Sequence, residues 1–201
     1  MKIFNSLTGK KETFNPKIKK EVSIYICGLT PYDEVHIGHA RTFINFDVIV
    51  KFLRFTGFKV KYVRNITDVD DKIINRAKEE GIPALDFSEK YIKEMQNDFL
   101  SLGIEPPDVE PKVSDHIDEI IYMIQSLEER GYAYRENKSD VFFDVQKFKD
   151  YGKLANRTLE QLSAAERTIK DLNKKYEADF VLWKVDTDGI TWPSPWGQGR
   201  P

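Results

Sequence analysis

The stretch "CGLTPYDEVHIGHAR", residues 27–41, holds the chain's single cysteine and two of its three histidines. Cys27 supplies a thiol, and His36 and His39 supply imidazoles around a glycine. Thiolate and imidazole are both zinc ligands, but imidazole N–H groups also donate hydrogen bonds to phosphate. Two interpretations follow. The residues could form one metal site with Asp33 as a fourth ligand, or a thiol site beside a separate phosphate site.

The elements around this stretch indicate where it lies. The run "VSIYIC", residues 22–27, is typical of a buried strand, and the apolar spacing from His39 to Thr56 predicts a helix. Residues 59–67 predict a second strand. Strand, helix and strand make a βαβ unit with parallel strands, whose ligands bind beyond the carboxyl ends of the strands. We therefore expect Cys27 and residues 65–68 to converge on one crevice.

The two histidines fall at the predicted start of the helix. Its first N–H groups lack internal partners and carry partial positive charge, so this end favours an anion such as phosphate. Gly38 would let a flat group such as a purine approach the backbone closely, while His36 and His39 would stabilise charge on a phosphate. The alternatives are a pair that only caps and packs, and the metal site. A helix N-terminus disfavours a cation, although histidines three residues apart could share one.

The rest of the chain predicts an α+β region. Beyond residue 80 we expect helices at 88–102 and 114–130, an extended linker "EPPDVEP", a hairpin within 132–145 and a polar, helix-prone stretch at about 158–177. The predicted organisation is residues 1–80 as the first half of a nucleotide-binding α/β domain and residues 81–201 as an insertion leading back to it.

Composition narrows the class of protein. The chain has 201 residues, 40% hydrophobic and 32% charged, with a net charge of −2. A single cysteine fits a reducing compartment, and no run of 18 apolar residues occurs, so we expect a cytoplasmic protein and no membrane partner. Two interpretations stay open for the N-terminal lysines, a contact with a phosphate backbone or a solvated surface; they are Lys2, Lys10, Lys11, Lys17, Lys19 and Lys20.

Other residues with chemical potential have simpler interpretations. We expect Asp68 to line the site, and Asp70 and Asp71 to be charges at a helix N-terminus, although the cluster could bind Mg²⁺. We expect His116 to be a surface or packing histidine. The tryptophans could stack on a base, but we favour core positions for them; they are Trp183, Trp192 and Trp196.

A long block, "YICGLTPYDEVHIGHARTFINFDVIVKFLRFTGFKVKYVRNITDVDDKIINRA", resembles the N-terminal segment of the cysteinyl-tRNA synthetases, which are class I aminoacyl-tRNA ligases. The similarity continues to "DFVLWK" and "WPSPWGQGRP" at the end of the chain. It therefore covers essentially all of the sequence. The resemblance implies a Rossmann-like class I nucleotide-binding half with a parallel sheet and an α+β connective insertion.

The resemblance also implies roles for individual residues. Cys27 would be one ligand of a Zn²⁺ ion that binds the thiolate of substrate cysteine and rejects serine, because a borderline-soft metal prefers sulfur. Gly28 and Thr67 would belong to the cysteine pocket. The ATP site would comprise Thr30, Pro31, Tyr32, His36, Ile37, Gly38 and His39, with His36 and His39 catalytic. The partners would be ATP with Mg²⁺, L-cysteine and tRNA(Cys). We expect the protein to be a monomer.

The sequence departs from the family pattern in one consistent way. The other zinc ligands, the KMSKS-type loop and the anticodon-reading region have no counterpart in these residues, so we expect the remaining ligands beyond residue 201 and an inactive chain when these 201 residues stand alone. Two alternatives are a ligase joining cysteine to an amino-sugar in thiol biosynthesis, and a short non-catalytic paralogue that binds tRNA or nucleotide.

Overall fold

The structure is a computed structural model that describes residues 1–136, 140–165 and 174–201. The chain forms two compact units, one of Asn15–His116 and one of Met1–Phe14 with Ile117–Pro201. The domain boundary expected near residue 80 stays a prediction, because compact packing does not define where a catalytic domain is interrupted. Each unit is described by itself.

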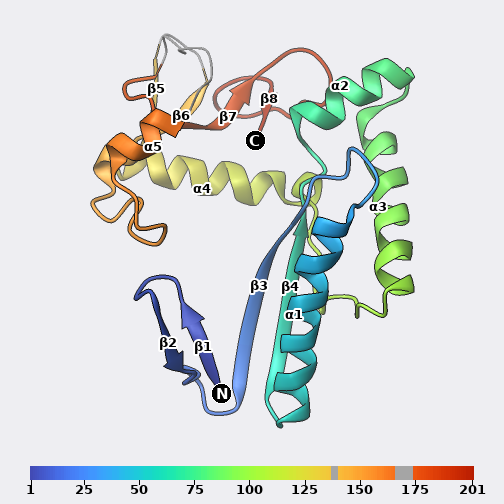
Figure 1. Cartoon of the computed structure of the whole chain (residues 1–201). Coiled ribbons are helices and arrows are strands. Elements are labelled where there is room, and N and C mark those ends of the chain that lie inside the picture. Colours follow the sequence, from blue (N-terminus) through green and yellow to red (C-terminus); the bar gives the residue numbers. More distant parts are fainter. Residues whose placement is uncertain (137–139, 166–173) are drawn as a thin grey trace. The chain divides into compact units, whose positions relative to one another are not determined.

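The predicted βαβ unit is present in Asn15–His116. Strand β3 (Glu21–Leu29) leads through a loop into helix α1 (Ile37–Phe55), and strand β4 (Lys59–Ile66) returns parallel to β3 (Figure 1). The helix ends at Phe55 with Thr56 as its C-cap, and Gly57 follows with a φ of 85°, the left-handed conformation expected of a glycine after a helix. The parallel α/β fold inferred from the apolar periodicity is confirmed.

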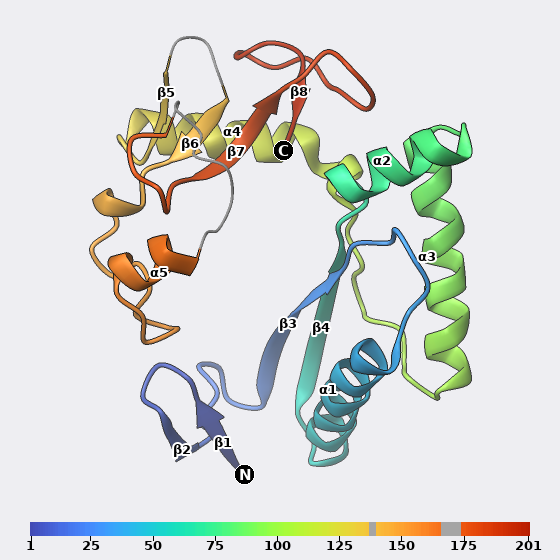
Figure 2. The same cartoon turned by 45° about the horizontal axis from the view of Figure 1, so that its top comes forward.

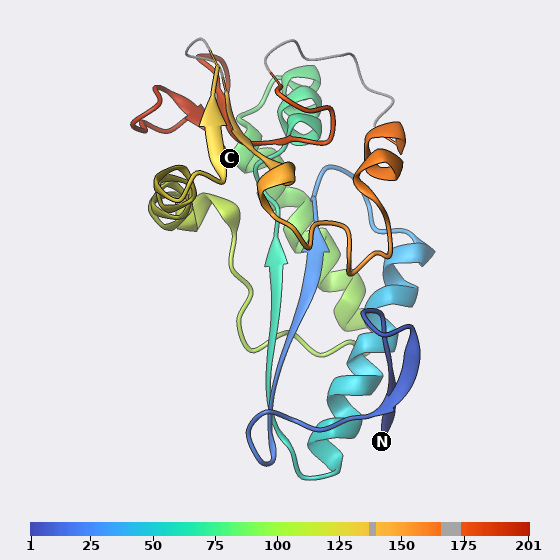
Figure 3. The same ribbon diagram turned by 90° about the vertical axis from the view of Figure 1, so that its left-hand side faces the viewer.

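One face of the β3–β4 pair carries the core of this unit. Helix α3 (Ala84–Ser101) lies with α1 on that face, and α2 (Asp71–Glu80) joins β4 to α3 (Figures 1 and 3). Phe43 of α1 and Phe99 of α3 meet there with ring centroids 4.9 Å apart. The buried residues of this cluster are Ile26, Phe43, Val50, Tyr62, Ile66, Ile92, Met95, Phe99 and Ile104.

The segment expected to be only a linker instead extends the sheet. Val109 and Lys112 form parallel bridges with Val63 and Ile66 of β4, on the side away from β3 (Figure 3). The Asp108 carboxylate also accepts a hydrogen bond of 2.6 Å from the Tyr62 backbone N–H. The prolines make the segment extended, as predicted. Its pairing with β4 could not be read from local composition because the partner strand lies more than 40 residues earlier.

The second unit contains two sheets. Strands β1 (Lys2–Asn5) and β2 (Lys10–Thr13) form an antiparallel hairpin. The other sheet is antiparallel in the order β5-β6-β7-β8, and α4 (Ile117–Glu129) lies along it (Figure 2). Its strands are β5 (Ala133–Arg135), β6 (Val141–Phe143), β7 (Phe180–Val185) and β8 (Gly199–Arg200). The predicted hairpin arms are therefore confirmed, while its turn at 137–139 lies outside the described residues.

Short helices lie between the larger elements of the chain, and the tryptophans lie in the core of the second unit. The short helices are η1 (Val113–His116), η2 (Val145–Lys147) and α5 (Leu159–Ala165), the last of which occupies part of the helix-prone stretch. Residues 166–173 of that stretch lie outside the described residues. Trp183 and Trp196 are buried and Trp192 packs against them, so the prediction of core tryptophans is confirmed.

Candidate functional site

The carboxyl end of β3 is irregular at the residues singled out by the sequence. Pairing is regular up to Ile26 opposite Arg64 and resumes with Leu29 opposite Ile66, so Cys27 and Gly28 together face Asn65. This is a β-bulge, a feature that is rare in parallel pairs and redirects side chains. The strand therefore does not end at Cys27 as expected but continues through Gly28 to Leu29.

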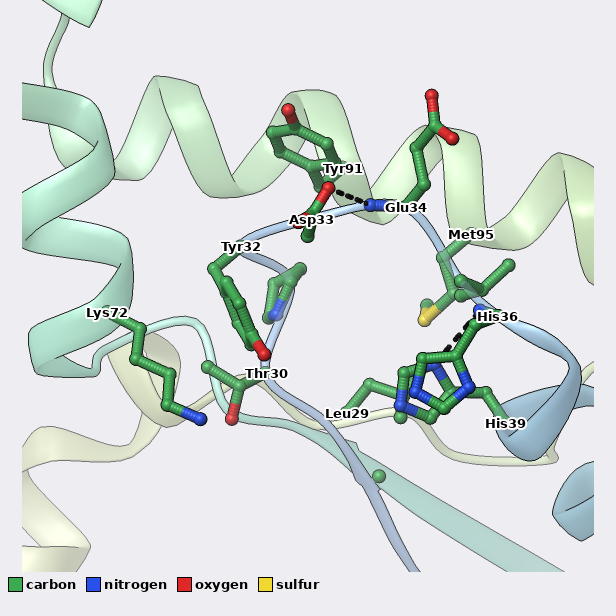
Figure 4. Close-up of a pocket in the computed structure, with 13 residues that line it drawn as sticks. Leu29, Thr30, Tyr32, Asp33, Glu34, His36, His39, Lys72, Tyr91 and Met95 are labelled. Atoms are coloured by element: carbon green, nitrogen blue, oxygen red, sulfur yellow. Dashed lines mark hydrogen bonds between the residues drawn. The ribbon is translucent and has the colours of Figure 1, made fainter. Parts of the chain in front are cut away.

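A hollow of about 280 Å³ lies beyond this strand end (Figure 4). Figure 4 shows His36 and His39 on one side of it and Tyr32 with Lys72 on the other. The loop from β3 to α1 forms most of its wall, α2 adds Lys72, and α3 adds Tyr91 and Met95. The lining residues are Gly28, Leu29, Thr30, Pro31, Tyr32, Asp33, Glu34, Val35, His36, His39, Lys72, Tyr91 and Met95.

The two histidines form the N-terminal cap of α1. Nδ1 of His36, the N-cap residue, accepts a hydrogen bond of 3.0 Å from the Gly38 N–H, and Nδ1 of His39 accepts one of 3.3 Å from the His36 N–H. These bonds satisfy two helix N–H groups in the manner of a capping box. Because each Nδ1 is an acceptor, the proton of each neutral ring sits on Nε2. The cap thus provides two neighbouring N–H donors.

The rings of this pair influence each other. They stack with centroids 3.7 Å apart and an interplanar angle of 22°. Burial lowers the pKa of His39 below its ordinary value, and the charge of His36 lowers this pKa further. His39 therefore favours its neutral form near pH 7, which suits it to donate a hydrogen bond rather than to act as a fixed cation.

Charged residues in the hollow come from the loop and from α2. Among the described residues that line the hollow, Lys72 is the only lysine or arginine. Its Nζ lies 4.8 Å from the centre of the Tyr32 ring. Asp33 and Glu34 are exposed carboxylates of the loop, and Asp33 accepts a hydrogen bond from the Glu34 N–H at 2.9 Å. A polyanion entering this hollow would need further positive charge, such as that of a divalent cation.

The structure brings most of the predicted ATP-site residues together. Thr30, Pro31, Tyr32, His36 and His39 line the hollow. Ile37 and Gly38 are the first two residues of α1 beside it, and Ile37 is 88% exposed. The His36 ring lies next to Gly38, since a Cβ added to Gly38 would be 2.9 Å from Nδ1 of His36. The approach of a flat group such as a purine to the Gly38 backbone stays a prediction.

The residues assigned to the cysteine pocket lie at the strand ends. Gly28 lines the hollow, while Cys27 is exposed and lies outside its lining, as does Thr67. The Thr67 N–H donates to the Leu29 carbonyl at 2.9 Å, so the two strand ends are connected. Their assignment to a substrate stays a prediction.

The lining of the hollow differs from the sequence-based prediction at several residues. Lys72, Tyr91 and Met95 line the hollow although their sequence context is that of ordinary helices. Asp68 does not line it: the carboxylate is buried and accepts hydrogen bonds from the backbone N–H and the hydroxyl of Ser114. The sequence signal that could have identified Lys72 is its position two residues after Asp70, the N-cap of α2, close to the end of strand β4.

The interpretation of residues 27–39 as one metal site is wrong for this structure. Throughout residues 1–136, 140–165 and 174–201, no three His, Cys, Asp or Glu side chains are grouped so that they could hold a metal ion. The two histidines instead use their Nδ1 atoms to cap α1. The helices of the same ranges include none that is long and apolar enough to cross a membrane.

Comparison with known proteins decides the family. Residues 13–201 match the family described as tRNA synthetases class I (C) catalytic domain. This chain belongs to that family. Among curated relatives of this synthetase domain, the cysteine–tRNA ligase of Idiomarina loihiensis is 52% identical over 99% of the chain, and that of Pasteurella multocida is 52% identical over 100%. The chain spans 44% of the length of each of these relatives.

Solved structures agree on the fold of the synthetase domain. Methionyl-tRNA synthetase of Mycobacterium tuberculosis, in complex with methionyl-adenylate, aligns with a TM-score of 0.52 and 21% identity. The alignment covers 63% of this chain and 24% of that one. The expected class I Rossmann-like α/β fold is thereby confirmed.

Proposed function

We propose that the polypeptide containing this domain activates L-cysteine with ATP and transfers the cysteinyl group to tRNA(Cys). The observation that carries the proposal is the capped start of α1, where His36 and His39 present two Nε2–H donors beside a hollow at the end of a parallel strand. Family membership and relatives named cysteine–tRNA ligase support the same reaction.

In the proposed first step, a carboxylate oxygen of cysteine attacks the α-phosphorus of ATP. The bond from this phosphorus to the bridging oxygen breaks, and pyrophosphate leaves with magnesium. His36 and His39 donate hydrogen bonds to phosphate oxygens as their charge rises, and the N-terminus of α1 contributes its partial positive charge. The loop residues Thr30, Pro31 and Tyr32 form the wall against which the nucleotide is held. In the second step a hydroxyl at the tRNA 3′ end attacks the acyl carbon and AMP leaves.

The substrate cysteine is proposed to lie at the bulge. Gly28 and Thr67 flank it, with Cys27 exposed beside them. Zinc binding does not follow from the residues described, since Cys27 has no grouped companions among them. A zinc site completed by ligands outside residues 1–201 stays a prediction from the resemblance, and no step of the proposed reaction depends on it.

The first experiment is cysteine-dependent ATP–pyrophosphate exchange by the polypeptide as cells make it, with serine as the control amino acid. Exchange with cysteine followed by transfer to tRNA(Cys) supports the proposal. Exchange without transfer to tRNA, but with transfer to an amino-sugar, would favour the thiol-biosynthesis ligase. Binding of tRNA without exchange would favour the non-catalytic paralogue. The same assay on residues 1–201 alone tests the expectation that they are inactive by themselves.

A variant pair tests the role of the histidines. His39→Asn removes an Nε2–H donor from the hollow, and we expect kcat of exchange to fall about 100-fold, as for loss of one donor to a developing charge. His116→Asn is the matched control, because His116 is exposed in η1 and does not line the hollow. An unchanged kcat for His39→Asn would contradict the assignment.

A further inference from the structure

The bulge at the end of β3 depends on one residue of the neighbouring strand. Cys27 and Gly28 occupy the place of one ladder residue opposite Asn65. A bulge leaves backbone groups outside the regular ladder, and such groups need other partners. The Asn65 side chain supplies one of them, since its Oδ1 accepts the Gly28 N–H at 2.7 Å.

The same amide makes two further hydrogen bonds. Oδ1 also accepts the Tyr25 hydroxyl at 2.9 Å, and Nδ2 donates to the Thr67 hydroxyl at 3.3 Å. The Asn65 amide therefore connects the bulge on β3 with the residue that follows β4. These connected residues include Gly28 and Thr67, which flank the proposed position of substrate cysteine.

The Asn65 backbone is equally close to the bulge. A Cβ added to Gly28 would lie 1.5 Å from the Asn65 carbonyl oxygen, which is a direct overlap. Only glycine allows the two backbones to approach in this way. The close approach and the two Oδ1 bonds together fix how the Cys27–Gly28 peptide is turned.

We propose that Asn65 is a positioning residue for substrate cysteine, acting through the Cys27–Gly28 bulge and the Thr67 hydroxyl. The inference rests on the proposed function for its substrate. Asn65 itself lies outside the lining of the hollow beside His36 and His39, although Gly28, whose N–H it accepts, is part of that lining. Loss of its amide should weaken use of cysteine and leave use of ATP unchanged.

The test compares Asn65→Ala and Asn65→Asp in exchange assays on the polypeptide as cells make it. Asn65→Ala should raise KM for cysteine about tenfold, since all three hydrogen bonds of the amide are lost, with KM for ATP unchanged within twofold. Asn65→Asp keeps an acceptor for Gly28 and Tyr25 but loses the donor to Thr67, so it should give an intermediate KM for cysteine. Asn45→Ala, an exposed asparagine of α1, is the matched control and should change neither KM.

A readout independent of activity accompanies the kinetics. Hydrogen exchange of the Gly28 amide should accelerate at least tenfold in Asn65→Ala and stay near the wild-type rate in Asn65→Asp. If the wild type catalyses cysteine-dependent exchange, the inference is overturned when Asn65→Ala changes both KM values equally or changes neither. It is also overturned when the exchange rate of the Gly28 amide is the same in Asn65→Ala as in the wild type. A wild-type protein lacking cysteine-dependent exchange would overturn the proposed function instead, while the Gly28 measurement would still report whether Asn65 holds the bulge.

Discussion

The His36 and His39 imidazoles stack with centroids 3.7 Å apart, while each Nδ1 accepts a backbone N–H at the start of α1. One arrangement therefore caps the helix and selects the ring tautomers, while burial lowers the pKa of His39 and the charge of the neighbouring His36 lowers it further. A proton added to Nδ1 of His39 would place a positive charge beside the neighbouring imidazole. It would also remove an acceptor that the start of the helix uses.

The first prediction concerns the pKa of His39. We expect a value below 6.5 in an NMR titration, because burial and then the charge of His36 disfavour the protonated ring. His36→Asn should raise this pKa toward 6.5, since asparagine can still cap the helix but removes the stacked ring. Ile37→Ala, at an exposed neighbour, should leave it unchanged. A His39 pKa above 6.5 in the wild type would contradict the prediction.

The same shift predicts how stability depends on pH. The unfolded chain binds a proton at His39 near pH 6.5, whereas the folded chain binds it at a lower pH. Between these two values the unfolded state holds more protons, so this contribution is complete above about pH 6.5 and is lost as the pH falls through the folded pKa. Urea midpoints measured from pH 7.5 to 5 should fall less steeply in His39→Gln than in the wild type.

Gly28→Ala should be strongly destabilising. The new Cβ would overlap the Asn65 carbonyl, so the strands must separate at the bulge, at a cost of about 3 kcal/mol. Gly57→Ala is the comparison: its φ is 85° but no atom lies within 4 Å of the added Cβ, so only backbone strain of about 1 kcal/mol applies. Equal losses in the two variants, measured by urea denaturation, would show that close approach at Gly28 is unimportant.

Arg64→Ala should destabilise the unit Asn15–His116. Arg64 is buried, its Nε donates to Glu110 at 2.8 Å, and its guanidinium lies 5.1 Å from the Phe43 ring centre and 5.0 Å from that of Phe99. Removing it leaves Glu110 without this partner and costs about 3 kcal/mol. Lys61→Ala, on the same strand and exposed, should cost less than about 0.5 kcal/mol.

The distribution of tryptophan provides the measurement for Arg64. All three tryptophans lie in Ile117–Pro201, so their fluorescence reports on the other unit. Hydrogen exchange of β4 amides reports on the unit that contains Arg64. Faster exchange in β4 with an unchanged fluorescence transition is the expected result, and unchanged exchange in β4 would contradict the prediction.

Asp68→Ala should be more costly than Asp70→Ala. Asp68 is buried and accepts two hydrogen bonds from Ser114, whose donors would lose their partner, at a cost of about 2 kcal/mol. Asp70 caps α2 at a half-buried position by accepting the Lys72 N–H at 2.8 Å, and its loss should cost about 1 kcal/mol. The reverse order in thermal unfolding would show that Asp68 is not the stronger structural residue.

The sequence alone determined the βαβ unit, the helix start at the histidines and the family resemblance. These are local properties: apolar periodicity, β-branched runs, glycines after helices and a contiguous motif. The imidazole cap is also local, because its bonds join residues two and three apart.

Tertiary structure decided what depends on distant pairs. The bulge at Cys27 and Gly28 requires Asn65, the buried Asp68 requires Ser114, and the segment of Asp108 becomes part of the sheet only beside β4. No local pattern encodes these contacts, because each joins residues some 40 positions apart whose approach is fixed by packing of the whole unit. Lys72 enters the hollow for the same reason, since the direction of α2 and not its composition places it there.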